Sequence, residues 1–132
     1  MAIDNHITGS GNFVRIYEGI LDSKAMIELP PSAIKGFLYM LRTKDIFNDH
    51  DIFHFTFEQA KRVGVCSSSD TFISIKKRLI AHGLIDQVCI GGMKSGSTFK
   101  LSGRWRLYGE ENFINVEYKP GINHNNINKP KQ

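Results

Sequence analysis

The sequence predicts an α+β fold that has a three-helix core and a small antiparallel β-hairpin. Two patterns predict it. The stretch from Thr56 to Ile85 has the start and stop signals of a short helix, a turn and a longer helix, followed by the start of a strand. From Phe99 to Leu107, apolar and charged residues alternate, which is typical of a strand with one buried face. The chain has 132 residues, 41% of them hydrophobic, so we expect one domain with a single core.

Composition sets the expected boundaries of this domain. We assign residues 13–109 to it. Residues 1–12 are polar and contain glycine, so we expect a flexible N-terminal segment. Residues 110–132 form a C-terminal extension that is rich in Asn, Lys and Pro toward its end. Because such a composition offers little to build a core from, we expect the end of the extension to be largely disordered.

The first half of the domain predicts one long helix and a short strand. Asp22 or Ser23 is a suitable N-cap for a single helical turn over Lys24–Glu28. The next helix starts near Pro31, since proline is tolerated in a first turn. Its apolar residues form one stripe at helical spacing, namely Ile34, Phe37, Leu38 and Leu41. The aromatic run Phe53–Phe55 suits a small strand.

Two helices joined by a turn follow this strand. Thr56 is the expected N-cap of the first, and Gln59, three residues later, completes a capping box. Gly64 ends that helix, where a left-handed residue is favoured. The second helix runs to about His82 and stops at Gly83.

The second of these helices has two faces when its residues are placed at about 100° intervals. Phe72, Ile75 and Leu79 form the core stripe, and Lys76 lies close to it. The opposite face carries short polar and cationic residues: Asp70, Thr71, Ser74, Lys77, Arg78 and Ala81. A helix that reads base edges needs such a face, because short side chains permit close approach and cations bind phosphates and guanine edges.

A basic hairpin completes the domain. The glycine-rich stretch Gly91–Ser97 predicts its turn. In the strand that follows, the inward residues are expected to be Phe99, Leu101, Trp105 and Leu107. The outward residues are expected to be the cations Lys100, Arg104 and Arg106.

Positive charge is concentrated on this part of the chain. Nine of the 17 Lys and Arg residues lie between Lys61 and Arg106, where only Asp70 and Asp86 oppose them. This segment therefore carries +7 and the remainder −3, within a total of +4. A solvated face usually mixes both signs, so the segregation favours an anionic partner.

A helix–turn–helix followed by a basic hairpin is typical of the winged helix-turn-helix, which binds duplex DNA. We therefore expect sequence-specific binding of double-stranded DNA, without catalysis, a metal or a cofactor. The residues expected to contact DNA from the second helix are Ser68, Ser69, Thr71, Ser74, Lys77 and Arg78. Those expected to contact phosphates from the hairpin wing are Lys94, Lys100, Arg104 and Arg106.

The sequence also resembles a family over residues 13–108, namely the winged helix-turn-helix domains of phage and plasmid replication proteins and related bacterial mobile-element proteins. The matching residues before the helix pair are Ile20–Ser23, Ala25, Leu29, Ser32, Ala33, Leu38, Tyr39 and Leu41. Those from the helix pair onward are Ala60, Gly64, Val65, Thr71, Leu79, Gly83–Ile85, Lys100 and Trp105–Leu107. The chain departs from the family at Cys66–Asp70, where its turn is longer. The resemblance implies a role in transcription regulation or DNA replication.

Other classes of function have weaker support. His50 and His54 are four residues apart and flanked by acidic residues, but this segment is expected to be a loop that leads into a strand. Cys66 has no evident base beside it, and Ser67–Ser69 lack a nucleophile elbow. A winged helix that binds a protein as an adaptor, without DNA, remains the alternative.

Compartment and assembly follow from composition. Two cysteines, with no secretory signal, favour reduced thiols and a cytoplasmic protein. No stretch approaches the roughly 18 apolar residues of a membrane span. We expect a monomer or a weak homodimer, because no long amphipathic helix outside the core offers a zipper.

Overall fold

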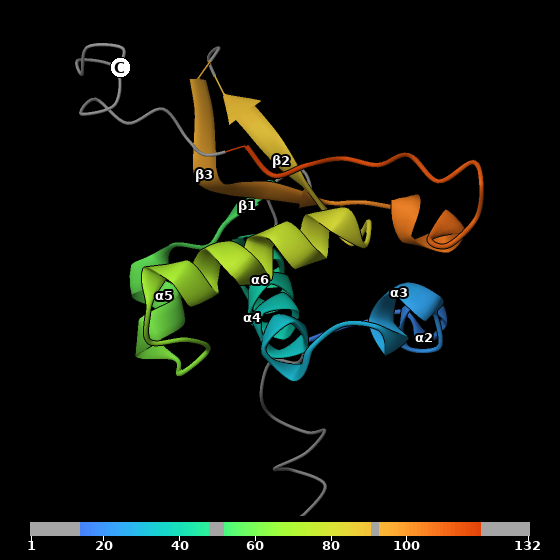
Figure 1. The fold of residues 1–132 in the computed structure, drawn as a ribbon. Helices are drawn as coiled ribbons and strands as arrows, with labels where there is room; N and C mark the ends of the chain where they lie inside the picture. The colour runs from blue at the N-terminus through green and yellow to red at the C-terminus, as the bar shows by residue number, and fades with distance from the viewer. Residues whose placement is uncertain (1–13, 48–51, 91–92, 120–132) are drawn as a thin grey trace, which may run out of the picture.

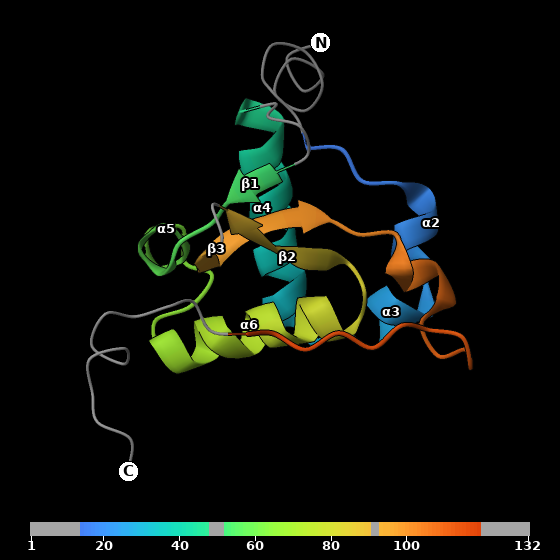
Figure 2. The ribbon, with the colours of Figure 1, turned by 90° about the horizontal axis from the view of Figure 1, so that it is seen from above.

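The computed structural model describes residues 14–47, 52–90 and 93–119. In chain order, the elements are α2 (Glu18–Leu21), α3 (Lys24–Ile27), α4 (Pro31–Phe47), β1 (Ile52–His54), α5 (Phe57–Arg62), α6 (Ser69–Ala81), β2 (Ile85–Ile90), β3 (Met93–Leu101) and the 3₁₀ turn η2 (Arg104–Leu107). The fold is α+β, with a three-stranded antiparallel sheet in the order β1-β3-β2. The sheet lies over α4 and α6 (Figure 1). Seen from above, α2 and α3 lie beside η2 at one end of the molecule (Figure 2).

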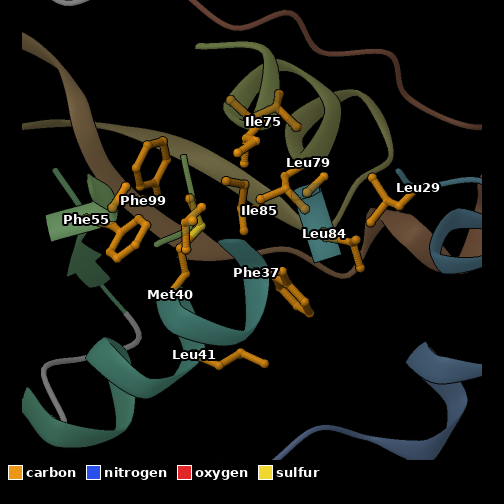
Figure 3. Close-up of a cluster of buried hydrophobic side chains, with 14 of the residues drawn as sticks. Leu29, Phe37, Met40, Leu41, Phe55, Ile75, Leu79, Leu84, Ile85 and Phe99 are labelled. Atoms are coloured by element: carbon orange, nitrogen blue, oxygen red, sulfur yellow. The ribbon is translucent and has the colours of Figure 1, made fainter. Parts of the chain in front are cut away.

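The core fills the space between the sheet and the two long helices. Phe37 and Met40 of α4, Ile75 and Leu79 of α6 and Phe99 of β3 belong to one cluster of buried hydrophobic side chains (Figure 3). All five side chains are at most 2% exposed. The buried face of α6 is therefore the one that the sequence predicts.

The buried stripe of α4 differs from the expected one. Phe37 and Leu41 are buried, as predicted. Leu38, however, is 40% exposed, and Ile34 is only partly buried. The buried positions also include Ala33 and Met40. The helix is rotated relative to the expected stripe because Gly36 faces Ile75 of α6, which permits a closer approach than a larger residue would.

The contact between α4 and α6 depends on Gly36. A methyl group at this position would lie 2.9 Å from Cγ2 of Ile75, and Cβ atoms in proteins essentially never come this close to another heavy atom. Ile75 is 2% exposed, and its branched methyl has little room to move. The crossing of the two helices at this point therefore requires glycine.

The helix pair forms as the sequence predicts. The Oγ1 of Thr56 accepts a hydrogen bond from the backbone of Gln59, and the Gln59 side chain bonds back to the backbone of Thr56, which completes the capping box. Gly64 ends α5 with a φ of 78°. At the end of α6, Gly83 has a φ of 83°, and a Cβ there would lie 2.7 Å from the backbone nitrogen of Trp105. Glycine thus lets η2 pack closely against the end of α6.

The last strand is shorter than predicted. β3 ends at Leu101, and the chain then turns into η2, so the expectation of one strand through Leu107 is wrong. The turn is stabilised by backbone bonds from Ser102 to Leu84 and from Trp105 to Gly83, each 3.0 Å long. The pairing of β2 with β3 shifts in register between Gln87 and Cys89.

The segment 110–119, which we call the strap, packs against the domain without forming a strand. Val116 and Tyr118 lie against the core, and the strap runs along α6 in both views (Figures 1 and 2). The chain thus continues to contact the core beyond residue 109. The expected flexible segment 1–12 and the expected disorder at the end of the chain lie outside the described residues.

Replacing Gly36 with alanine is expected to destabilise the fold. Alanine favours a helix over glycine by about 1 kcal/mol. Overpacking the core costs about 1–3 kcal/mol, which should exceed that gain. Thermal unfolding provides the measurement. Gly19→Ala is the matched control, because a Cβ there lies 3.6 Å from Cη2 of Trp105, an ordinary contact. A Gly36→Ala variant as stable as the control would contradict the close crossing.

Candidate nucleic-acid interface

The surface of α6 opposite its core stripe is exposed along its whole length. Ser74, Lys77 and Arg78 lie there, together with Asp70 and Ala81, and all are exposed. The helix is amphipathic because its apolar residues recur at helical spacing. The three residues with the strongest expectation of base contact therefore share one accessible face.

The N-terminus of α6 is capped by its own side chains. The hydroxyl of Ser68 accepts a hydrogen bond from the backbone nitrogen of Thr71 at 3.2 Å. It also bonds to the Thr71 hydroxyl at 2.9 Å. Both residues are exposed, as is Ser69. Ser68 and Thr71 thus fix the first turn of the helix, and their hydroxyls remain at the surface.

Two adjacent lysines of α6 have opposite environments. Lys77 is exposed and, within the described part of the chain, has no ion-pair partner. Lys76 is only 5% exposed. Its Nζ donates a hydrogen bond to the Tyr118 hydroxyl at 2.9 Å and lies 4.5 Å and 4.7 Å from the ring centroids of Phe72 and Tyr118. Lys76 is therefore a core residue that holds the strap, which agrees with its predicted position near the buried stripe.

Burial lowers the pKa of Lys76 from 10.5 to about 8, because the desolvated ammonium loses its hydration. Burial also raises the pKa of Tyr118 above its ordinary value of 10.0. Both shifts arise because the contact between the strap and α6 excludes water.

Arg104 does not point outward from a strand, and that expectation is wrong. Its Nε and Nη2 donate to Oδ1 of Asp86 at 3.0 and 2.7 Å. Nη2 also bonds to the carbonyl oxygen of Ile80 at 2.8 Å, and Nη1 bonds to that of Ile114 at 3.0 Å. The side chain is only 13% exposed. One guanidinium therefore joins the end of α6, the start of β2 and the strap, and it is occupied by these contacts.

The other predicted wing cations do not form one group. Lys100 is exposed on β3, opposite Asp86 of β2. Arg106 lies on η2, outside the hairpin, with its guanidinium 4.7 Å from the ring of Trp105. The backbone of Lys94 is in β3, and its side chain lies outside the described residues. A phosphate contact by any of these residues stays a prediction.

The structure also places cations around the turn before α6 that the sequence analysis did not assign to the candidate site. Lys35 of α4 donates from its Nζ to the carbonyl oxygen of Gly64 at 3.1 Å, in the turn before α6. Lys61 and Arg62 end α5 beside the same turn. No sequence pattern joins Lys35 to this turn, because the two meet only through the packing of α4.

The histidines and the cysteine near the helix pair show no arrangement for metal binding among the described residues. His54 Nδ1 is 3.0 Å from the Thr98 hydroxyl, and His50 is outside the described residues. Burial raises the pKa of the Cys66 thiol, and the nearby Lys61 partly opposes this shift. Within the described ranges, no three His, Cys, Asp or Glu residues are grouped closely enough to hold a metal ion.

Among the helices that the structure describes, none is both long and apolar enough to cross a bilayer.

Comparison with known proteins gives no family assignment. No protein-family model matches the sequence, and neither curated proteins nor solved structures give a significant match. Any assignment of function therefore depends on the chain's own residues and geometry.

The buried lysine predicts a specific pH dependence of stability. Unfolding returns Lys76 to water and restores its ordinary pKa of 10.5, so the unfolded chain binds an extra proton between about pH 8 and pH 10. The free energy of unfolding should rise over this window, by at most about 1.4 kcal/mol per pH unit. Above pH 10, the raised pKa of Tyr118 should reverse the trend, because the unfolded tyrosine loses its proton first.

Urea unfolding at pH 7.5–10 measures this effect. Lys76→Met should abolish the rise, since methionine keeps much of the volume without a titrating group. Lys77→Met, one residue away and exposed, should preserve it. An unchanged rise in Lys76→Met would mean that another group is responsible.

Proposed function

We propose that this protein binds double-stranded DNA sequence-specifically through a winged helix-turn-helix. In this proposal α5 and α6 are the helix-turn-helix, α6 is the recognition helix, and the β2–β3 hairpin is the wing. The role would be that of a transcriptional regulator or a replication-associated protein. The antiparallel sheet, the capped helix pair and the order of elements support the proposal.

The observation that carries the proposal is the exposed face of α6. Ser74 lies near the middle of this face, and Lys77 and Arg78 supply the cations. Within the described ranges, neither cation has an ion-pair partner. A cation available in this way can donate to guanine O6 and N7 in the major groove, and the short Ser74 allows the helix to approach. Asp70 can accept from a cytosine amino group on the same face.

Lys77 and Arg78 lie outside the core, so substituting them tests DNA binding without changing the packing of the core. Phe72, Ile75 and Leu79 hold the opposite face in place and are at most 4% exposed. Truncating Lys77 and Arg78 therefore removes readout without opening a cavity. This separation allows DNA recognition and stability to be measured independently.

The Lys77→Ala/Arg78→Ala double variant is expected to lose discrimination between its site and random DNA. A bidentate contact to a base contributes about 1–3 kcal/mol of discrimination. Selection from a randomised duplex library would provide the site, and fluorescence anisotropy would measure the affinities. We expect weak non-specific binding and the melting temperature to be preserved.

Arg42→Ala is the control, since this exposed cation lies on α4 rather than on α6. A double variant that selects its site as well as the wild type would contradict the role of α6. If the wild type binds no duplex at low salt, the proposal fails, and a protein-binding adaptor becomes the better reading of the fold.

A further inference from the structure

Different elements pack along the two sides of α6 that border its exposed face. Ile75 faces Gly36 of α4, whereas Lys76 contacts Tyr118 of the strap. In Figure 1 the strap crosses above α6, and the N-terminal end of α4 lies below it. A duplex seated on α6 would therefore meet α4 and the turn after α5 on one side, and the strap and the hairpin on the other.

Three cations gather on the α4 side, around the turn of residues 63–68. Lys35 places its ammonium 3.1 Å from the carbonyl oxygen of Gly64. Lys61 lies close enough to influence the Cys66 thiol electrostatically, and Arg62 ends α5 at the start of the turn. All three cations are exposed. We call them the turn cluster.

Little negative charge opposes the turn cluster. Lys61 Nζ lies 3.4 Å from Oε1 of Glu58, and both groups are exposed, so solvent screens this pair strongly. For Lys35 and Arg62, the described part of the chain provides no ion pair. Among the described residues, Lys35 and Arg62 therefore carry positive charge that no ion pair neutralises.

The strap side is different. Residues 110–119 include Glu110, Glu111 and Glu117 but only one cation, Lys119. The strap is attached through Lys76 to Tyr118 and through paired hydrogen bonds between the Gln87 amide and the backbone of Lys119. Arg104, which bonds to the strap at Ile114, is already bound to Asp86 and to three backbone carbonyls. There, an incoming phosphate would meet carboxylates and a guanidinium whose donors are already bonded.

We infer that the turn cluster of Lys35, Lys61 and Arg62 holds the DNA backbone beside α6, and that the strap of residues 110–119 does not. This inference rests on the proposed binding of duplex DNA and says where its phosphates lie. The cluster leads directly into α6, so a phosphate held by it would set the depth and register of the helix in the groove. Such contacts carry charge but no base information, so their loss weakens binding to all sequences alike.

The test is the salt dependence of duplex binding by Lys35→Ala/Arg62→Ala. Each phosphate contact contributes about 0.9 to the slope of log K against log[salt], so the double variant should flatten the slope by about 1.8. Its affinity should fall equally for selected and random duplexes. Arg62→Ala alone should flatten the slope by about 0.9, and because this side chain is exposed, the variant should keep the fold.

Two matched controls define the result. Arg42→Ala removes an exposed cation two turns further along α4, and Lys119→Ala removes the cation of the strap. Both should leave the slope unchanged. An unaltered slope in the double variant, with wild-type binding intact, would overturn this inference alone. A slope that flattens only in Lys119→Ala would move the backbone to the strap side, and a wild type that binds no duplex would overturn the proposed function as well.

Discussion

The close crossing of α4 and α6 is the constraint on which the rest of the structure depends. Gly36 lets Ile75 approach its backbone, and this contact sets how closely α6 packs against α4. The end of α6 is fixed separately, because Gly83 packs against η2 and the Arg104 guanidinium binds the carbonyl oxygen of Ile80 at 2.8 Å. A recognition surface works only when its support is rigid. The exposed face of α6 is held at its middle and at its end in this way.

The local signals in the sequence were sufficient for the helix pair. Thr56 with Gln59 marks the start of α5, and Gly64 and Gly83 mark the two helix ends, because caps and left-handed glycines act within a few residues. Periodicity alone also placed the buried and exposed faces of α6. These features are predictable because they are local and repeat a simple spacing.

Three features were not predictable, and each depends on tertiary contacts. The alternation from Phe99 to Leu107 continues past the end of β3, but Arg104 is drawn inward by Asp86, and the backbone turns. The face of α4 depends on Gly36 meeting Ile75, a contact between distant parts of the sequence. Lys35 reaches the turn before α6 only because α4 packs there. The buried and exposed faces of α6 were thus predictable from the sequence, and the packing of the elements around this helix was not.

Charge has three distinct uses in this small domain. Lys76 is buried between aromatic rings and holds the strap. The Arg104 guanidinium is occupied by hydrogen bonds to backbone carbonyl oxygens. Lys77 and Arg78 remain at the surface, where they are available to a partner. Counting cations along the sequence therefore overestimates the number available to an anionic partner, because the structure shows that some of them stabilise the fold instead.

The most direct test of the central claim is an NMR titration that maps the surface contacted by duplex DNA. ¹⁵N-labelled protein would be titrated with a selected duplex at low salt, and the shift of each backbone amide would be followed. The account predicts that the largest shifts fall on the exposed face of α6, around Ser74, Lys77 and Arg78, and on the turn that precedes this helix. Largest shifts on the strap, or no shifts with excess duplex, would contradict it.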